Sequence, residues 1–152
     1  MQNFNHIFFY ASIMLLAGVG IPIMGALSGG LGVRLQSPAL VAVVLFIVGF
    51  VLSLAFLFFV EGLPSSLPKE PIPIQYYLGG FFILFYTLSI TWVGPKFGIG
   101  NAVSFVLLGQ LVSMSVIDHF GLMGALNYPI TQQRLMGLLL MAVGVLLVVK
   151  RF

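Results

Sequence analysis

The stretch VLLGQLVSMSVIDHFG, residues 106–121, holds the side chains of this chain that are best suited to chemistry. An amide, Gln110, stands in the middle of an otherwise apolar run, and Asp118 and His119 stand near its end. A carboxylate and an imidazole can exchange protons, and an imidazole does so near neutral pH. Polar groups at membrane depth are costly, and they usually face a protein interior or a water-filled cavity. The pattern therefore raises the question of what surrounds this segment.

The composition places the chain in a membrane. Of its 152 residues 61% are hydrophobic and only 6% are charged, whereas a soluble domain carries about 25% charged residues. The absence of cysteine excludes disulfides and thiolate metal sites. The few Lys and Arg residues form no cluster, so a nucleic-acid partner is not expected. No catalytic triad, metal-ligand cluster or phosphate-binding loop is present, and we expect neither an enzyme nor a cofactor.

Five apolar segments are each close to the length of about 20 residues that a helix needs to cross a bilayer. They cover residues 7–27, 39–60, 76–93, 97–117 and 130–149. We predict a single membrane domain over residues 1–152, an all-α integral membrane bundle of five transmembrane helices, because a backbone in lipid must satisfy its own hydrogen bonds. Residues 61–75 contain four prolines and are expected to form a solvated loop.

The odd number of spans puts the two termini on opposite sides of the membrane. Basic residues favour a cytoplasmic C-terminus by four to two. So small a bias is compatible with insertion in both orientations.

The fourth span carries polar groups on two sides when it is drawn as a helix of about 100° per residue. One arc holds Asn101, Ser104, Ser115 and Asp118, and the opposite side holds Gln110 and Ser113. We interpret this helix as lying between a cavity and a packed interface.

Several of these polar side chains have a structural as well as a functional interpretation. Gln110 either bonds to a neighbouring helix or contacts a substrate. Asp118 and His119 are either an interfacial cap and anchor or a gating and proton-binding pair. Tyr86, central in the third span, needs a hydrogen-bond partner or a cavity.

Glycines are expected at helix contacts. Gly25 and Gly29 have the four-residue spacing of closely packed membrane helices, and Gly137 and Gly144 share one face of the fifth span. The second pair indicates a packing seam, either within the chain or between chains.

Four stretches in order, GALSGGLGVRLQSPALVAVVLFIVG, LGGFFILFYTLSITWVGPKFG, LLGQLVSMSVIDHFGLMG and RLMGLLLMAVGVLLV, resemble the YdcZ-type family of small membrane proteins in the drug/metabolite transporter superfamily. The most specific elements are Ser37-Pro38, Gly94-Pro95-Lys96, Gly109-Gln110 and residues 118–121. The resemblance implies a multi-pass protein of the bacterial inner membrane that forms half of a transporter.

From the resemblance and the absence of an internal repeat we expect a second copy of the chain, or a paired homologue, to complete the transporter as an antiparallel dimer. The expected function is export of a small organic solute or metabolite by alternating access. Substrate would contact Tyr86, Asn101, Ser104 and Gln110, with Asp118 and His119 at a gate. A small ion channel and a non-transporting accessory subunit of a membrane complex are the alternatives.

Overall fold

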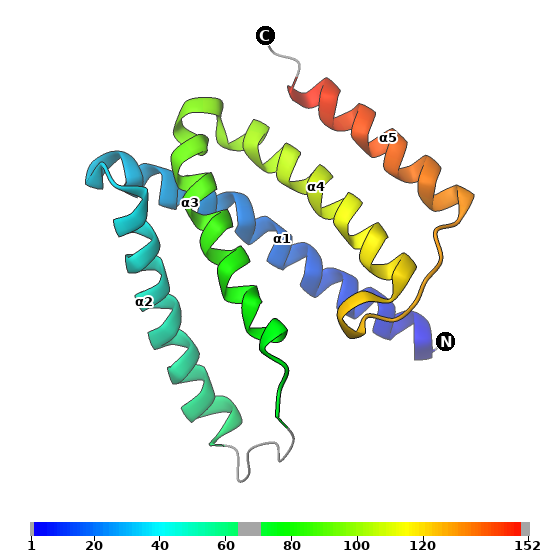
Figure 1. The fold of residues 1–152 in the computed structure, drawn as a ribbon, viewed down its shortest axis with the longest axis horizontal. Helices are drawn as coiled ribbons and strands as arrows, with labels where there is room; N and C mark the ends of the chain where they lie inside the picture. The colour runs from blue at the N-terminus through cyan, green and yellow to red at the C-terminus, as the bar shows by residue number, and fades with distance from the viewer. Residues whose placement is uncertain (1, 64–70, 150–152) are drawn as a thin grey trace. The chain divides into compact units, whose positions relative to one another are not determined.

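A computed structural model describes residues 2–63 and 71–149. Over these residues the long segments are all helical, and no strand is formed. Five helices are long and apolar enough to cross a membrane: Phe8–Leu35, Pro38–Glu61, Ile74–Phe97, Ile99–Phe120 and Gln132–Val149 (Figure 1). The prediction of an all-α membrane protein with five spans is thus confirmed.

The chain divides into two compact units, residues 1–96 and 97–152. Unit 1 consists of α1 (Gln2–Leu35), α2 (Pro38–Phe56) and α3 (Gly79–Phe97), with a π-helical turn, η1 (Leu57–Glu61), after α2 and a 3₁₀ turn, η2 (Ile74–Leu78), before α3. Unit 2 consists of α4 (Ile99–Phe120), a 3₁₀ turn, η3 (Leu122–Gly124), and α5 (Gln132–Val149). Within the predicted proline-rich loop, residues 64–70 lie outside the described range.

Helix α1 continues through the glycine-rich segment to Leu35, beyond residue 27, where the sequence predicts the first span to end. Glycine lowers helix propensity in water by about 1 kcal/mol per residue. In a bilayer, however, intrahelical bonds are the only means of satisfying the backbone. Gly29 is also buried, so its lack of a side chain serves packing here.

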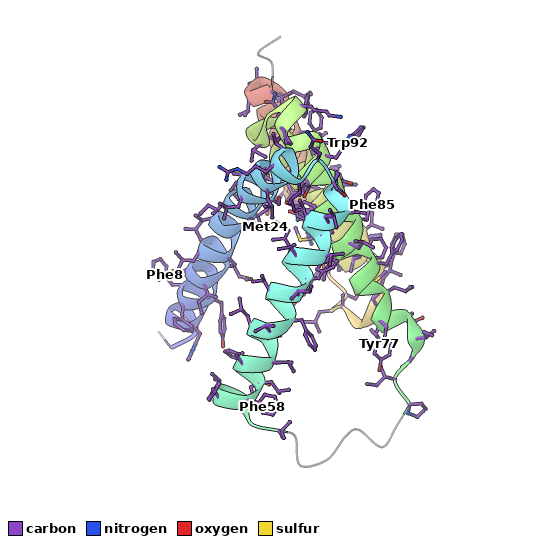
Figure 2. The ribbon with its side chains drawn as sticks, turned by 90° about the vertical axis from the view of Figure 1, so that its left-hand side faces the viewer. Phe8, Met24, Phe58, Tyr77, Phe85 and Trp92 are labelled. Carbon is purple, nitrogen blue, oxygen red and sulfur yellow. The ribbon has the colours of Figure 1, made fainter. Side chains whose placement is uncertain are left out.

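The helices of unit 1 approach each other where α1 ends and α2 begins, and they spread apart toward their other ends (Figures 1 and 2). Most of the buried residues here are small, and on α1 and α3 they recur at intervals of three or four positions. They are Gly25, Ser28 and Gly29 on α1, Val41 and Ala42 on α2, and Thr87, Ile90, Thr91 and Gly94 on α3. Such residues let helix backbones come close, and this contact drives association in lipid.

Ser37 ends the short connection between α1 and α2 and caps α2. Its side-chain oxygen accepts a hydrogen bond from the N–H of Leu40 at 3.3 Å, and Pro38 occupies the first turn. A serine cap followed by proline is a strong helix-start signal because it satisfies one free N–H and removes another. The turn between the two spans is therefore set by local sequence.

In unit 2, α4 and α5 pack against each other as antiparallel neighbours (Figure 1). Gly121 ends α4 in the left-handed conformation, with φ 58°, and its N–H donates to the carbonyl of Ile117. A Cβ at this position would also lie 3.4 Å from both the Ala125 carbonyl oxygen and Asn127 Cβ. Glycine thus allows the chain to turn sharply and return toward the start of α5.

Candidate functional site

An ion pair joins the two helices of unit 2 where α4 ends and α5 begins. Arg134 Nη2 donates to Asp118 Oδ2 at 2.6 Å, and the two side chains are 34% and 32% exposed. Thr131 caps α5 on the N-terminal side of this arginine, because its hydroxyl oxygen accepts from the Arg134 N–H at 3.2 Å. The cap and the ion pair together fix the first turn of α5.

Each charge of this pair is unfavourably placed on its own helix and favourably placed for its neighbour. Asp118 is in the last turn of α4, where the helix dipole is negative, and Arg134 is in the first turn of α5, where it is positive. Because the helices are antiparallel, Asp118 lies beside the positive end of α5 and Arg134 beside the negative end of α4. The pair therefore stabilises the antiparallel contact and neither helix alone.

His119 holds the returning loop. Its Nδ1 accepts a hydrogen bond from the backbone N–H of Ile130 at 3.1 Å, so the ring proton of this neutral imidazole is on Nε2. Beside it, the N–H of Tyr128 donates to the carbonyl of Asp118 at 2.8 Å. Asp118 and His119 thus anchor the segment between α4 and α5 at two points, Tyr128 and Ile130.

This arrangement gives Asp118 and His119 the structural role that the sequence left open, while their gating and proton-binding roles stay predictions. Arg134 ties the Asp118 carboxylate to the first turn of α5, and Ile130 ties the His119 ring to the loop just before that helix. Breaking either contact would loosen the start of α5 from the end of α4. We call this cluster of Asp118, His119 and Arg134 the latch between the two helices.

Two of the predicted substrate contacts, Asn101 and Ser104, lie in the first half of α4 and are half-buried. Asn101 Nδ2 donates to the Phe97 carbonyl at 3.0 Å, and the Ser104 hydroxyl donates to the Gly100 carbonyl at 2.9 Å. The Ser104 hydroxyl uses its one donor on its own helix, and Asn101 uses one of the two N–H donors of its amide there. Both keep a side-chain oxygen available to accept a hydrogen bond from a solute, and Asn101 also keeps a second N–H that can donate one.

The other two predicted contacts lie apart in the sequence, Gln110 in the middle of α4 in unit 2 and Tyr86 on α3 in unit 1. Gln110 is exposed. The Tyr86 hydroxyl is buried and has no hydrogen-bond partner among the described residues. A buried hydroxyl without a partner is unfavourable by about 1–3 kcal/mol. Tyr86 therefore has unused capacity for a hydrogen bond.

The predicted packing glycines fall into two groups. Gly25 and Gly29 are buried in α1. At Gly137 and Gly144 of α5, a Cβ would meet nothing within 4 Å. An added methyl group at either position would thus meet no other described atom, and the role of this pair as a packing seam, within the chain or between chains, stays a prediction.

Arg134 is the member of the latch that the sequence analysis missed. A signal was present, because the short connection between the fourth and fifth spans places the acid ending one helix at the same membrane face as the base starting the next. In the sequence, Arg134 contributes only to the difference in basic residues between the two sides of the membrane, so its pairing with Asp118 was not predicted. Thr131, which caps the same turn, was missed with it.

Five apolar helices, each long enough to span a bilayer, define a multi-pass membrane protein. The profile of the YdcZ family, described as "Putative inner membrane exporter, YdcZ", matches residues 9–147. The chain belongs to this family and is a multi-pass protein of the inner membrane, in a family of exporters rather than enzymes. No curated protein and no solved structure matches the chain.

Proposed function

We propose that the protein is a dimeric inner-membrane transporter that exports a small organic solute or metabolite by alternating access. Membership of an exporter family supports the class of activity. Secondary transporters place their substrate near the membrane midplane, between two repeats that rock against each other. In this proposal two copies of the chain supply the two repeats.

The proposal of a dimer depends on one observation, the exposure of the Gln110 side chain. Helix α4 runs over Ile99–Phe120, so Gln110 is at its midpoint, and Ser113 is exposed one turn further on. An amide facing acyl chains at this depth would be left without hydrogen-bond partners, which is costly in hydrocarbon. A second copy packed on this face would cover Gln110 and supply partners for it.

We propose the antiparallel arrangement because many secondary transporters pair repeats of inverted topology. A two-fold axis in the membrane plane maps the midpoint of α4 onto the midpoint of the partner's α4, so the two Gln110 side chains face one shared space. Asn101 and Ser104 lie on the opposite side of α4 from Gln110, and Tyr86 is on α3 of unit 1, so each of them stays a separate predicted contact with substrate. Neutral amides and hydroxyls suit an uncharged or weakly charged polar solute.

Disulfide crosslinking tests the dimer directly because the chain contains no cysteine. Leu107 and Met114 flank Gln110 on α4 and are 43% and 48% exposed. In an antiparallel pair Leu107→Cys of one copy approaches Met114→Cys of the other, so mixing the two single variants yields a dimer. Each variant alone yields little, because about 10 Å along the axis separates its two copies, more than a disulfide spans.

Crosslinking of each variant with itself would indicate a parallel dimer and contradict this arrangement. Absence of all crosslinks, together with a monomer in light scattering, would contradict the dimer itself.

Transport is tested by counterflow in proteoliposomes with a panel of radiolabelled small solutes. We expect saturable exchange for one chemical class and a reduction of at least about tenfold in Gln110→Leu, since a lost hydrogen bond to a solute is worth about 1.4 kcal/mol or more. The control Val112→Ala changes an exposed apolar residue of the same helix and should leave exchange unchanged. Single-channel currents would instead identify a channel, and no flux at all an accessory subunit.

In this proposal Asp118 and His119 form the gate, because their contacts hold the start of α5 against the end of α4 and must open for the two helices to separate there. Asp118→Asn is expected to abolish flux driven by a pH gradient while solute counterflow continues. Arg134→Gln also breaks the ion pair but keeps the carboxylate, so it should retain the pH-driven component. Equal losses in both variants would remove Asp118 as a proton carrier and leave it a structural role.

A further inference from the structure

A pocket of about 260 Å³ lies at the end of unit 1 where its three helices approach each other. Its walls come from the last turn of α1, the start of α2 and the last two turns of α3. Clefts that bury a drug-sized ligand measure about 300–1,000 Å³. This pocket therefore suits a small group whose remainder lies outside it.

The pocket is at the membrane surface. Trp92, which is 58% exposed, and Lys96 both line it, and tryptophan and lysine are typical of the boundary between hydrocarbon and headgroups. Arg34, in the last turn of α1, is at the same end. In a copy inserted as the positive-inside rule favours, these two cations place the pocket on the cytoplasmic side. In an antiparallel partner the same pocket lies at the opposite membrane surface.

The charge at this end of unit 1 is uncompensated. Lys96 Nζ lies 4.1 Å from the centre of the Trp92 ring, and within the described range it has no ion-pair partner. The only acid of unit 1 within that range, Glu61, ends η1 at the far end of α2. An anion entering the pocket would thus meet a lysine on an aromatic face and no carboxylate.

Two further polar groups line the same pocket. Thr91 is 2% exposed, and its hydroxyl has no hydrogen-bond partner in the described part of the chain. Gln36 has a left-handed backbone, with φ 52°, at a position just after a helix where glycine is the favoured residue. Strained residues persist where the surroundings or a function require the side chain. Here the strained residue, Gln36, is part of the wall of the pocket.

We propose that this pocket binds the phosphate of an anionic membrane lipid. Lys96 supplies the charge, Gln36 donates a hydrogen bond to a headgroup oxygen, and Trp92 covers the glycerol region. The acyl chains follow the apolar surface beside Val33, which is 64% exposed. A lipid fits better than a soluble anion because valine, two prolines and tryptophan make up much of the lining, and basic pockets between helices on the cytoplasmic side commonly hold lipid headgroups.

The test measures thermal unfolding and native mass spectra of the purified protein with added phosphatidylglycerol, phosphatidylcholine or inorganic phosphate. We expect phosphatidylglycerol to raise the melting temperature more than phosphatidylcholine does and to remain bound in the mass spectrometer. Lys96→Gln should weaken phosphatidylglycerol binding by about fivefold, the effect of one lysine near an anionic surface. Lys96→Arg keeps the charge and should keep the binding.

Two controls separate the pocket from general charge and bulk. Lys69→Gln removes the same charge from the segment that connects α2 to α3 and should leave lipid binding unchanged. Val33→Trp fills the pocket and should abolish the preference for phosphatidylglycerol, whereas Val19→Trp adds the same bulk to an exposed site on α1 and should not. The proposal would be overturned if Lys96→Gln and Val33→Trp bound phosphatidylglycerol as well as the original chain does. It would also be overturned if inorganic phosphate stabilised the protein as much as phosphatidylglycerol does at the same concentration.

Discussion

Replacing Gly32 with alanine adds a methyl group where α1 passes α3. An ideal Cβ at Gly32 lies 2.7 Å from Thr91 Cγ2, 3.6 Å from the Thr91 carbonyl oxygen and 3.8 Å from Val41 Cγ2. Carbon atoms in contact are normally about 3.5–4.0 Å apart. Thr91 cannot turn away easily, since its side chain is β-branched and it is 2% exposed. The helices themselves must therefore move apart.

The expected loss is the difference of two opposing effects. Inserting a methyl group into a packed site costs about 1–3 kcal/mol. Exchange of glycine for alanine in a helix returns up to about 1 kcal/mol. We therefore expect Gly32→Ala to lower the free energy of unfolding by about 1–2 kcal/mol.

A rescue experiment assigns this loss to a single atom. Thr91→Ser removes Cγ2, the atom that the new methyl group would meet, and alone should cost about 1 kcal/mol through lost packing. In the double variant the alanine methyl occupies the space that Cγ2 leaves, so stability should return close to that of the original chain. The predicted coupling energy is about 2–3 kcal/mol in favour of the double variant.

The assay is unfolding of the purified protein in mixed micelles with increasing SDS, followed by circular dichroism. Gly30→Ala is the matched control, because a Cβ there meets nothing within 4 Å, and it should be neutral or stabilising. If Gly32→Ala behaves like Gly30→Ala, or if Thr91→Ser fails to rescue it, the contact between α1 and α3 is not as described and the reasoning is refuted.

Three further predictions concern single contacts. In a double-mutant cycle of Asp118→Asn and Arg134→Gln, the coupling energy should be about 1–2 kcal/mol, between the values for exposed and desolvated ion pairs. This coupling should fall in 1 M salt. A coupling energy near zero would show that the ion pair does not stabilise the fold. His119→Leu should destabilise by about 1 kcal/mol because the Ile130 N–H loses its acceptor, whereas His119→Asn, which keeps an acceptor near the same place, should lose less in the same assay. Gln36→Gly should raise the melting temperature by relieving the left-handed strain at φ 52° while weakening phosphatidylglycerol binding; a lower melting temperature would contradict the strain argument.

The spans were predictable because the signal for them is local. A run such as residues 39–60 must be helical in lipid whatever its neighbours are, and α2 with its π-helical turn covers Pro38–Glu61. The end of α1 was harder to predict, because the residues that extend it, Gly29 to Leu35, read as a loop in water. In lipid the backbone favours the helix through them, and the burial of Gly29 adds a packing reason that comes from the tertiary structure.

The latch illustrates the limit of reading one helix at a time. A helical wheel of the fourth span places Asp118 on a polar arc, and that result is independent of any other segment. Its partner, Arg134, belongs to another helix and comes within 2.6 Å through the turn at Gly121. The path of that loop decides the pairing.

By itself the sequence determined that this chain crosses the membrane five times as helices, since hydropathy and the backbone's need for hydrogen bonds act within each segment. It also determined the small residues that let helices approach, such as Gly25 and Gly29. Only the tertiary structure decided which groups meet: Asp118 with Arg134, Gly32 with Thr91, and Lys96 with Trp92 beside a pocket. The physical reason is that such contacts depend on how each helix is rotated about its axis and tilted against its neighbour, and in lipid packing between side chains sets both.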